Sequence, residues 1–385
     1  MIRPEFFIDT LGSYGIDFFV GVPDSLLKNF CAVLSARLDS RHNIIAANEG
    51  GAIGLAAGHY LATGRPACVY MQNSGEGNAV NPLASLMDGD VYGLPALLVI
   101  GWRGEPGVKD EPQHAKQGKI TLSLLDCLGI PYSVLSDNED VASDQISDAL
   151  AAINAGGVYA LVVRKGTFSA PEDVPAAEPS AAAPAAELSR ESAIQAVAAA
   201  LGPQDIVVST TGMISRELFE YRESAGEGHG HDFLTVGSMG HASQIALGIA
   251  LERPDRRVCC FDGDGAVLMH MGSMAIVGQS GASNYVHIVF NNGAHDSVGG
   301  QPTVGLAVDL CAVARAVGYR SATRVSTVAG LSSALAALLP ASGAGSSAGP
   351  AFLEIVVRKG NRPDLGRPTT TPVQNRDAFM DFLKA

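Results

Sequence analysis

Two short polar motifs in the C-terminal half of the chain contain residues that could bind a metal ion. DGDG (262–265) directly follows an apolar run, and NNG (291–293) ends the next apolar run along the chain. A strand–helix–strand crossover between the two runs would place Asp264 and Asn292 at the same edge of a parallel sheet. A carboxylate, an amide oxygen and nearby backbone carbonyls suit Mg²⁺, which usually completes its ligand shell with phosphates. The glycines let the backbone approach closely and a following helix would offer amides to phosphate, so the motifs predict a metal-bridged diphosphate.

Three other kinds of structure fit DGDG less well. In an EF-hand loop starting at Asp262, the fifth and twelfth positions would be Ala266 and Ser273, which do not match the ligand pattern. A dinucleotide-binding fingerprint would need a third glycine and an acidic strand end about 20 residues further on, and both are absent from the sequence. Two unrelated surface turns remain an alternative for each motif alone, but their spacing on adjacent strands favours a shared site.

The elements that must position these motifs alternate in both halves of the chain. Short apolar runs are separated by segments of helical length; the runs are GIDFFVGVP, NIIAAN, PACVYMQ, PALLVIGW and VYALVVRKG, then DIVVSTTG, FLTVGSMG, RVCCFDGDG, VHIVFNNG and AFLEIVVRKG. Continuous apolar strands alternating with helices predict parallel sheets covered on both faces. The expected fold class is α/β, with two doubly wound parallel-sheet domains whose ligands gather at the carboxyl ends of the strands. The segment AVLMHMGSMAIVGQSG between the two motifs is predicted to be one helix.

A low-complexity segment separates the two halves. The stretch APEDVPAAEPSAAAPAAE is dominated by Ala, Pro and acidic residues and lacks helical or strand periodicity, so residues 170–188 are predicted to be a linker. A Pro-rich linker is stiff and extended, and one of this length could span about 50 Å. The predicted domains are therefore residues 1–169 and 189–385. A second patch of small residues, PASGAGSSAGPA (340–351), is predicted to be a helix–strand loop.

The composition argues against some classes of partner and location. The 385-residue chain has 47% hydrophobic and 17% charged residues and a formal net charge of −13. This acidic balance argues against nucleic acid or an anionic membrane as the main partner. The six cysteines form no CxxC pair, which favours a reducing, cytoplasmic location. No cleavable signal pattern begins the sequence, and no apolar run reaches the roughly 18 residues that a membrane span needs.

The spacing of GDG (263–265) and NN (291–292) resembles the signature of the thiamine diphosphate enzymes. The resemblance implies the thiamine diphosphate-binding fold in both domains. A pyrimidine-type domain would come first and a diphosphate-type domain second, with no middle domain between them. The resemblance also implies that thiamine diphosphate and Mg²⁺ are the cofactors.

In this family the metal ion holds the diphosphate of the cofactor. The resemblance implies that Asp264, the side chain of Asn292 and the carbonyl oxygen of Ala294 are the protein ligands of Mg²⁺. The spacing is one residue longer than is common in the family, so Asn291 and Asn292 both remain candidates for the amide ligand. Other residues that the resemblance places at the diphosphate are Gly263, Gly265, Ala266, Thr211 and Gly212.

Two more segments resemble parts of the family's cofactor site. Glu49 lies between the run NIIAAN and a Gly/Ala-rich helix, like the glutamate that hydrogen-bonds the pyrimidine ring and drives it to the imino tautomer, which takes the C2 proton of the thiazolium. GSMG (237–240) resembles the segment that bends the cofactor, with Met239 as the apolar wedge between its rings. Taken alone, Glu49 would be read as a helix cap and Met239 as an ordinary core residue.

The compact layout implies a substrate class. Enzymes of the pyruvate decarboxylase type usually insert a middle domain, whereas this chain has only the linker. With GVPDSLL, GEPGVKDEPQHAKQG, NNGAHDSVGGQPT and LGRPTTTP, it resembles the phosphonopyruvate decarboxylases over nearly its full length, and the sulfopyruvate decarboxylases are their nearest relatives. The resemblance implies decarboxylation of 3-phosphonopyruvate to phosphonoacetaldehyde and CO₂ in phosphonate biosynthesis, through a thiazolium ylide and an enamine.

A basic segment after the run PALLVIG is predicted to bind the anionic group of the 2-oxo acid. Arg103, Lys109 and His114 are the predicted substrate contacts, and His114 is also the candidate proton donor. Lys116 and Lys119 lie in the same segment, where a solvated surface charge is the more ordinary role.

Four residues at other strand ends complete the predicted site. Asp24 and His295 are candidates for proton handling, although a structural cap is an equally good interpretation of Asp24. Arg362 and Arg367 follow the last predicted strand and are candidates to close over the substrate.

Because Glu49 and the metal ligands lie in different domains, the resemblance implies an active site between the subunits of a homodimer or homotetramer. Decarboxylation of sulfopyruvate stays an alternative, because phosphonate and sulfonate are both tetrahedral anions. Three other functions are less consistent with the residues. A thiamine diphosphate-dependent carboligase would lack the basic substrate segment, a 2-oxo acid:ferredoxin oxidoreductase would need cysteines spaced for an iron–sulfur cluster, and a nicotinamide dehydrogenase would need the missing fingerprint.

Overall fold

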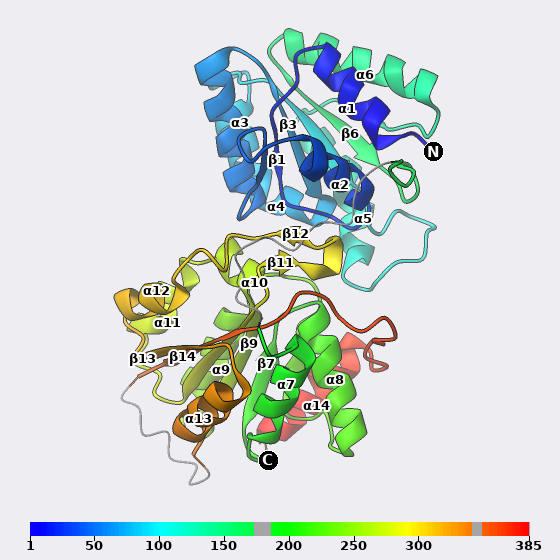
Figure 1. The fold of residues 1–385 in the computed structure, drawn as a ribbon. Helices are drawn as coiled ribbons and strands as arrows, with labels where there is room; N and C mark the ends of the chain where they lie inside the picture. The colour runs from blue at the N-terminus through cyan, green and yellow to red at the C-terminus, as the bar shows by residue number, and fades with distance from the viewer. Residues whose placement is uncertain (173–185, 341–348, 385) are drawn as a thin grey trace. The chain divides into compact units, whose positions relative to one another are not determined.

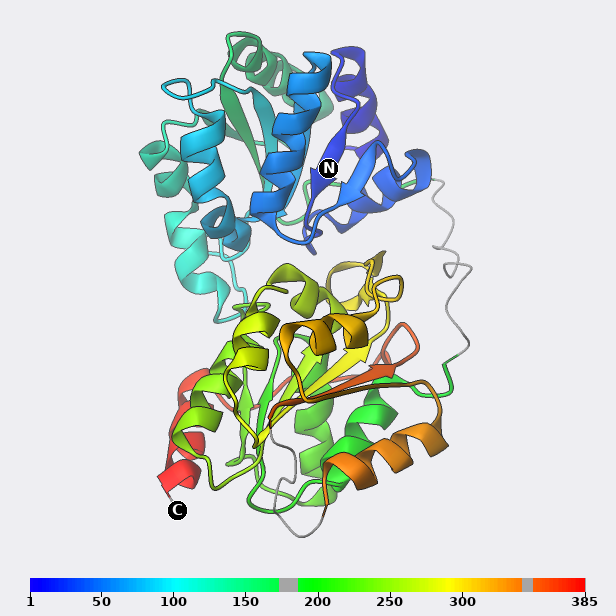
Figure 2. The same cartoon turned by 90° about the vertical axis from the view of Figure 1, so that its left-hand side faces the viewer.

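The computed structural model describes residues 1–172, 186–340 and 349–384. The chain divides into two compact units, unit 1 (Met1–Pro179) and unit 2 (Ser180–Ala385), and each contains its own six-stranded parallel sheet (Figures 1 and 2). The prediction of two parallel-sheet α/β domains is confirmed. Most of the predicted linker (170–188) and of the predicted loop (340–351) lies outside the described residues.

Unit 1 alternates helices and strands along the chain. Its elements are α1 (Pro4–Ser13), β1 (Phe19–Gly21), α2 (Lys28–Arg37), β2 (Asn43–Ile45), α3 (Glu49–Thr63), β3 (Ala67–Gln72), η1 (Asn73–Gly75), α4 (Glu76–Pro82), η2 (Leu83–Met87), β4 (Ala96–Gly101), α5 (His114–Cys127), β5 (Tyr132–Val134), α6 (Glu139–Asn154) and β6 (Val158–Val163).

Unit 2 repeats this alternation. Its elements are α7 (Arg190–Ala199), β7 (Ile206–Ser209), α8 (Met213–Ala225), β8 (Asp232–Leu234), α9 (Ala242–Glu252), β9 (Val258–Gly263), α10 (Asp264–Met269), α11 (Ser273–Gln279), β10 (Tyr285–Asn291), β11 (Ala294–His295), η3 (Asp296–Val298), β12 (Gln301–Pro302), α12 (Leu310–Val317), β13 (Ser321–Val325), α13 (Val328–Leu338), β14 (Ala351–Val356) and α14 (Pro372–Lys384).

The two six-stranded sheets have the same strand order. In unit 1 the order is β2-β1-β3-β4-β6-β5, and in unit 2 it is β13-β14-β10-β9-β7-β8, which is the same order read from the other edge. In both sheets the second strand of the unit lies at one edge beside the first strand, and the third strand lies on the other side of the first. The point where the direction reverses lies between β1 and β3 in unit 1 and between β7 and β9 in unit 2. Ligands of such sheets bind at the carboxyl ends of the strands near this point.

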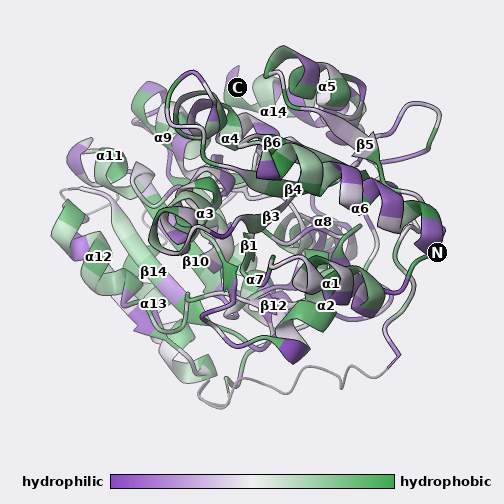
Figure 3. Cartoon of the chain, turned by 90° about the horizontal axis from the view of Figure 1, so that it is seen from above, coloured by the Kyte–Doolittle hydropathy of each residue, from purple (hydrophilic) through white to green (hydrophobic). Residues whose placement is uncertain are grey.

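Each sheet carries buried apolar side chains on both faces. In unit 1, one layer packs under α1, α2 and α6 and the other under α3, α4 and α5. In unit 2, one layer packs under α7, α8 and α13 and the other under α9, α11 and α12. Both faces are covered, which is why the strands read as continuous apolar runs. Outer helices such as α6 show hydrophilic and hydrophobic patches around their circumference, as expected for helices with one face on a sheet (Figure 3).

Capping residues in the sequence define the helix that carries Glu49. The side chain of Asn48 accepts a hydrogen bond from the Gly51 backbone N–H at 2.8 Å and so begins α3. The helix ends at Gly64, which adopts the left-handed conformation with φ 69°. Glu49 is therefore held in the first turn of α3.

Several elements differ from the sequence prediction, including the short strands β11 and β12, which were not predicted. The expected single helix after DGDG is two helices, α10 and α11, because the chain leaves helical geometry at His270 (φ −133°, ψ 48°). Strands β5 and β13 were not predicted; both lie at sheet edges and have partly exposed side chains, so their sequences lack a continuous apolar run.

In the ranges that the structure describes, no helix has both the length and the apolar character needed to cross a membrane.

Candidate active site

Asp264 lies at the carboxyl edge of the unit 2 sheet. It is the first residue of α10 and directly follows β9, and its buried Oδ2 accepts a hydrogen bond from the Thr303 hydroxyl. Burial raises the pKa of Asp264 to about 6, while the hydrogen bond from Thr303 opposes that shift. A Cβ atom at Gly305 would lie 2.5 Å from Oδ2, so glycine is needed for the loop to pack against this carboxylate. A bound cation would favour the ionised carboxylate here.

The two candidate amide ligands, Asn291 and Asn292, have different hydrogen-bond partners. Asn291 Nδ2 donates to the Gly305 carbonyl at 2.9 Å and to Glu354 Oε1 at 2.8 Å, and its Oδ1 accepts from the Gly293 N–H at 3.1 Å. The amide of Asn291 is thus engaged within unit 2. Asn292 Oδ1 accepts the Ala294 N–H at 3.0 Å, so each of the two Oδ1 atoms accepts one backbone N–H among the described residues and keeps a lone pair. The two residues differ in burial, since Asn291 is fully buried and Asn292 is 9% exposed, and Asn292 stays the predicted ligand.

Asp296 connects Asn292 to the interior of unit 2. Its Oδ2 accepts hydrogen bonds from Asn292 Nδ2 at 2.6 Å, Arg190 Nη1 at 2.8 Å and the Gly360 N–H at 2.9 Å. Arg190 in turn donates two 2.9 Å hydrogen bonds to Glu217. Since only the NH₂ end of an amide can donate to a carboxylate, Asp296 fixes which way the Asn292 amide points.

The other predicted residues of unit 2 lie around the same sheet edge. A Cβ atom at Gly265 would lie 2.9 Å from His295 Cε1 and 3.3 Å from Met239 Cε, so the His295 ring and the Met239 methyl group both approach the Gly265 backbone. Thr211 Oγ1 accepts a hydrogen bond from the Gly237 N–H at 3.1 Å, which connects the ends of β7 and β8. The structure therefore brings these predicted residues together.

Backbone geometry in this region also restricts the residue types. Gly212 has φ 106°, and Ser238 in the GSMG loop has φ 47°, the one positive φ of a non-glycine residue in the described ranges. Such conformations cost free energy and occur where the surrounding structure or a ligand requires them.

The residues at this edge fit a diphosphate with a divalent cation. Two buried hydroxyls, Thr210 Oγ1 and Thr235 Oγ1, have no hydrogen-bond partner among the described residues and could donate to anionic oxygens. Gly263 and Gly265 flank Asp264, and Gly212 lies in the turn after β7, so the backbone at these three positions carries no side chain. An acidic ligand for a cation, unpaired donors for an anion and bare backbone are together the features that a metal-bound diphosphate needs.

Glu49 lies at the carboxyl edge of the unit 1 sheet. It is 5% exposed, and its Oε2 accepts a hydrogen bond from Asn78 Nδ2 at 2.7 Å. A Cβ atom at Gly75 would lie only 2.3 Å from Oε1, so the turn after β3 must have glycine at this position. The Asn78 contact and the Gly75 backbone hold the carboxyl group from two sides.

Asp24 and Arg103 follow the carboxyl ends of β1 and β4 in the unit 1 sheet. Asp24 is fully buried after β1, its Oδ2 would be 2.2 Å from a Cβ atom at Gly101, and its Oδ1 has no hydrogen-bond partner among the described residues. Burial raises the pKa of Asp24 to about 6, and the charge of Arg103 acts in the opposite direction. Arg103 donates two hydrogen bonds to Asp110 and one to Ser25 Oγ at 2.7 Å. The guanidinium predicted to bind substrate is thus already paired with a carboxylate.

The predicted proton donor His114 is the first residue of α5 and is buried. Burial, followed by the charge of Arg103, lowers the pKa of His114 to about 4, so the ring is neutral near pH 7. Burial likewise lowers the pKa of His295 to about 4. Near neutral pH both rings are therefore uncharged and carry no extra proton to donate, whereas the pKa of Asp24 lies closer to neutral pH.

The predicted basic residues lie in different surroundings. Lys109, Lys116 and Lys119 are exposed, with no ion pair among the described residues. Arg362 pairs with Glu191 at 2.9 Å, with Asp364 at 3.0 Å and with Glu220. The hypothesis that Arg362 closes over the substrate is not supported, because α7 and α8 carboxylates hold its charge.

Sequence reasoning missed Asp110, Asp296 and a buried group in the core of unit 2. Asp110 stands seven residues after Arg103 in a loop, and Asp296 directly follows a predicted residue, but no pattern in the sequence indicated the contacts that either makes. The buried group is Cys260, Asp262 and His287, whose ligand atoms lie within 4.8 Å of one another. His287 Nε2 lies 3.3 Å from Asp262 Oδ2, and its Nδ1 lies 3.1 Å from the Tyr319 hydroxyl, so this group forms a hydrogen-bonded chain inside the core.

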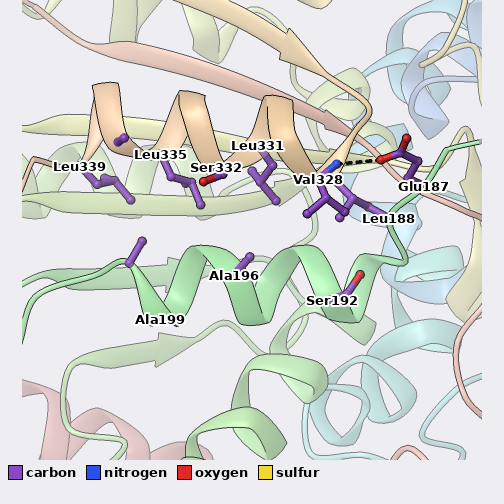
Figure 4. Close-up of a pocket in the computed structure, with 12 residues that line it drawn as sticks. Glu187, Leu188, Ser192, Ala196, Ala199, Val328, Leu331, Ser332, Leu335 and Leu339 are labelled. Carbon is purple, nitrogen blue, oxygen red and sulfur yellow. Dashed lines mark hydrogen bonds between the residues drawn. The ribbon is translucent and has the colours of Figure 1, made fainter.

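A groove of about 530 Å³ lies away from the candidate residues, between α7 and α13 (Figure 4). The Val328 N–H donates to Glu187 Oε2 at 3.0 Å at one end of it. None of the predicted site residues lines this groove, whose apolar lining includes Leu188, Ala196, Ala199, Leu331, Leu335 and Leu339.

Two family models match the chain. The model described as thiamine pyrophosphate enzyme, N-terminal TPP binding domain, matches residues 4–124, and the model described as thiamine pyrophosphate enzyme, C-terminal TPP binding domain, matches residues 210–355. The chain belongs to the thiamine pyrophosphate enzymes. The predicted fold and the predicted cofactor, thiamine diphosphate, are confirmed by this membership, whereas the roles of individual residues stay predictions.

Curated relatives of this thiamine pyrophosphate enzyme are similar to it along most of their length. A phosphonopyruvate decarboxylase of Streptomyces viridochromogenes is 37% identical over 400 residues, which cover 100% of this chain and 95% of the relative. A phosphonopyruvate decarboxylase of Streptomyces hygroscopicus is 35% identical over 397 residues, 99% of this chain and 94% of the relative. A sulfopyruvate decarboxylase of Methanosarcina acetivorans is 29% identical over 346 residues, 84% of each chain.

Because the chain belongs to the thiamine pyrophosphate enzymes, the contact between Asp296 and Asn292 predicts an effect on cofactor binding. We expect Asp296→Asn to weaken Mg²⁺-dependent binding of thiamine diphosphate by about 10- to 100-fold, the range typical of residues that orient metal ligands. An asparagine at this position no longer fixes the direction of the Asn292 amide. The dissociation constant would be measured by calorimetry.

A matched control is Asp232→Asn. Asp232 is also buried and pairs with an arginine, since Arg222 Nε donates to its Oδ2 at 3.0 Å, but it does not contact the NNG loop. This variant is expected to lose stability without a comparable loss of affinity. Equal affinity losses in the two variants would contradict the role given to Asp296.

Proposed function

We propose that the protein catalyses the decarboxylation of 3-phosphonopyruvate to phosphonoacetaldehyde and CO₂, using thiamine diphosphate and Mg²⁺. The observation that carries this proposal is the similarity to two phosphonopyruvate decarboxylases over almost the entire length of all three chains. The reaction breaks the bond between the carboxylate carbon and the carbonyl carbon, and the carbonyl carbon takes up a proton. A place in phosphonate biosynthesis follows from that substrate.

The residues of unit 2 would hold the cofactor through its charged end. Asp264, Asn292 Oδ1 and the Ala294 carbonyl would bind Mg²⁺, and the backbone at Gly263, Gly265, Ala266 and Gly212, with Thr211, would accommodate the diphosphate. Met239 would contact the rings of the cofactor. When bound, thiamine diphosphate supplies an electron sink for the electron pair left behind by CO₂.

The residues of unit 1 would handle protons. Glu49, held by Asn78, would form a hydrogen bond with the pyrimidine ring of the cofactor. Asp24 has an unpartnered oxygen and a pKa of about 6, so it is suited to exchange a proton near neutral pH. His114 and His295 would act as neutral hydrogen-bonding groups, because burial lowers the pKa of each.

Recognition of the anionic end of the substrate would depend on Lys109 more than on Arg103. Asp110 balances the charge of Arg103, which lowers its net attraction for an anion, whereas Lys109 has no ion pair in the described part of the chain. The guanidinium still has a fixed orientation that could serve a bidentate contact if Asp110 were displaced.

Sulfopyruvate is the second candidate substrate. The pairing of Arg103 with Asp110 leaves fewer uncompensated positive charges for the extra negative charge of a phosphonate, and a related decarboxylase acts on sulfopyruvate by its name. The test is to supply each 2-oxo acid separately to the purified protein with thiamine diphosphate and Mg²⁺ and to measure CO₂ and aldehyde. Turnover of sulfopyruvate alone would replace the substrate but keep the chemistry, and no CO₂ from either would favour a carboligase.

The assembly and location are also proposals. A homodimer or homotetramer is expected, because the predicted cofactor residues are divided between the two units and in this family the site forms between subunits. Sedimentation with and without thiamine diphosphate would measure the assembly. A cytoplasmic location is supported by the six cysteines, all of which are free thiols.

A further inference from the structure

Glu76 is a buried acid to which the proposed function gives no role. It is the first residue of α4 and follows the turn η1 at the end of β3. Its side chain is 3% exposed, and neither Oε1 nor Oε2 has a hydrogen-bond partner among the described residues. An unpaired polar group in the interior costs free energy, so its presence calls for a physical explanation.

Comparison with the other buried glutamates shows that Glu76 is unusual in this molecule. In the part of the chain that the structure describes, Glu49 accepts from Asn78, Glu217 pairs with Arg190, and Glu354 accepts from Asn291. Glu76 alone of these four has no donor. Burial raises the pKa of Glu76 to about 8, so at neutral pH its carboxyl group retains the proton and can donate a hydrogen bond.

The position of Glu76 associates it with the predicted cofactor site of unit 1. The preceding residue, Gly75, packs against Glu49 Oε1, and Asn78, two residues later, donates to Glu49 Oε2. In the sheet, β3 lies between β1, which leads to Asp24, and β4, which leads to Arg103. Glu76 therefore belongs to the segment that holds Glu49, at the edge where ligands of such a sheet bind.

We infer that Glu76 is a ligand-contacting residue whose carboxyl O–H donates a hydrogen bond to an acceptor atom of the small molecule bound beside Glu49. A buried carboxyl group kept neutral in order to donate is an established catalytic device in other enzymes. The acceptor has one of two sources: a ring nitrogen of thiamine diphosphate, or an anionic oxygen of the 2-oxo acid. The inference rests on the proposed function in taking these as the bound molecules.

The test uses two variants of nearly equal volume. Glu76→Gln keeps a neutral donor of the same length, and Glu76→Leu removes the donor. Calorimetry would give the dissociation constant of thiamine diphosphate in the presence of Mg²⁺, and steady-state kinetics would give the KM for 3-phosphonopyruvate. Thermal unfolding would verify that both variants fold; Leu is expected to be at least as stable as the native residue, because it removes an unpaired polar group from the interior.

In the Gln variant we expect both the dissociation constant of thiamine diphosphate and the KM to stay within about threefold of the native values. In the Leu variant we expect one of these two constants to rise by about tenfold or more. A higher dissociation constant for thiamine diphosphate identifies the cofactor as the acceptor. A higher KM for 3-phosphonopyruvate with an unchanged dissociation constant for the cofactor identifies the 2-oxo acid. The inference is overturned if Leu matches the native protein in both arms, or if Gln loses as much as Leu. A native protein that binds thiamine diphosphate but does not turn over phosphonopyruvate would instead refute the proposed substrate, and the calorimetric arm would still test Glu76.

Discussion

Replacing Glu49 with Gln is expected to lower the decarboxylation rate by about 10²- to 10⁴-fold, the range associated with loss of a positioned acid–base group. The substitution keeps the size of the side chain, which matters because Gly75 packs against Oε1. It also keeps an oxygen that can accept from Asn78. The carboxylate charge is the property that changes. CO₂ release under saturating thiamine diphosphate and Mg²⁺ would measure the effect.

Glu139→Gln is a closely matched control for Glu49→Gln. Glu139 begins α6 directly after Asn138, whose side chain caps the helix, just as Glu49 begins α3 after the capping residue Asn48. If Glu49 were only a helix-terminal acid, the two substitutions would have similar small effects. We expect Glu139→Gln to retain full activity, and a Glu49→Gln variant of equal activity would refute the assigned role.

Replacing Asp264 with Asn is expected to weaken binding of thiamine diphosphate with Mg²⁺ by about two orders of magnitude or more, because a direct carboxylate ligand of a hard cation is lost. Without added metal, the variant is expected to be the more stable protein above pH 6. Burial raises the pKa of Asp264 from its ordinary value near 3.8 to about 6, so the folded state loses stability as the pH rises through this range. Calorimetry and thermal unfolding would measure the two effects.

The other aspartate of DGDG supplies the control for Asp264→Asn. Asp262 is equally buried, but its Oδ2 faces His287 in the core at a distance of 3.3 Å. Asp262→Asn is expected to reduce the melting temperature and to leave the cofactor dissociation constant within a small factor of the native value. If both aspartates changed affinity equally, Asp264 would have no special part in holding the metal.

The sequence could predict those parts of the fold that depend on local patterns. β4 was predictable because all six residues of Ala96–Gly101 are buried between layers of helices, which requires an unbroken apolar run. β5 and β13 lie at sheet edges, where partial exposure permits polar residues and removes that signal. The break between α10 and α11 contains no proline. It accompanies a tertiary contact, since a Cβ atom at Gly240 would lie 2.6 Å from His270 Cδ2.

In the candidate site, too, only the residues that stand in a local sequence pattern could be predicted. Asp264, Asn292 and Glu49 could be proposed because each stands beside a recognisable strand end. The pairing of Arg103 with Asp110 could not, because the loop that contains them takes its shape from distant contacts such as the 2.8 Å hydrogen bond from Asn73 Nδ2 to the Arg103 carbonyl. Asp296 has partners 106 and 64 residues away, Arg190 and Gly360, which no local pattern connects to it.

The shared strand order of the two units has a consequence for how such a protein can be encoded. Among the residues that the structure describes, each six-stranded sheet has apolar layers on both faces and takes its strands from one unit alone. Neither fold therefore depends on the peptide bond that joins the units, and two separate genes could specify them equally well. What fusion into a single reading frame guarantees is stoichiometry, because every ribosome that completes the chain delivers one copy of each sheet.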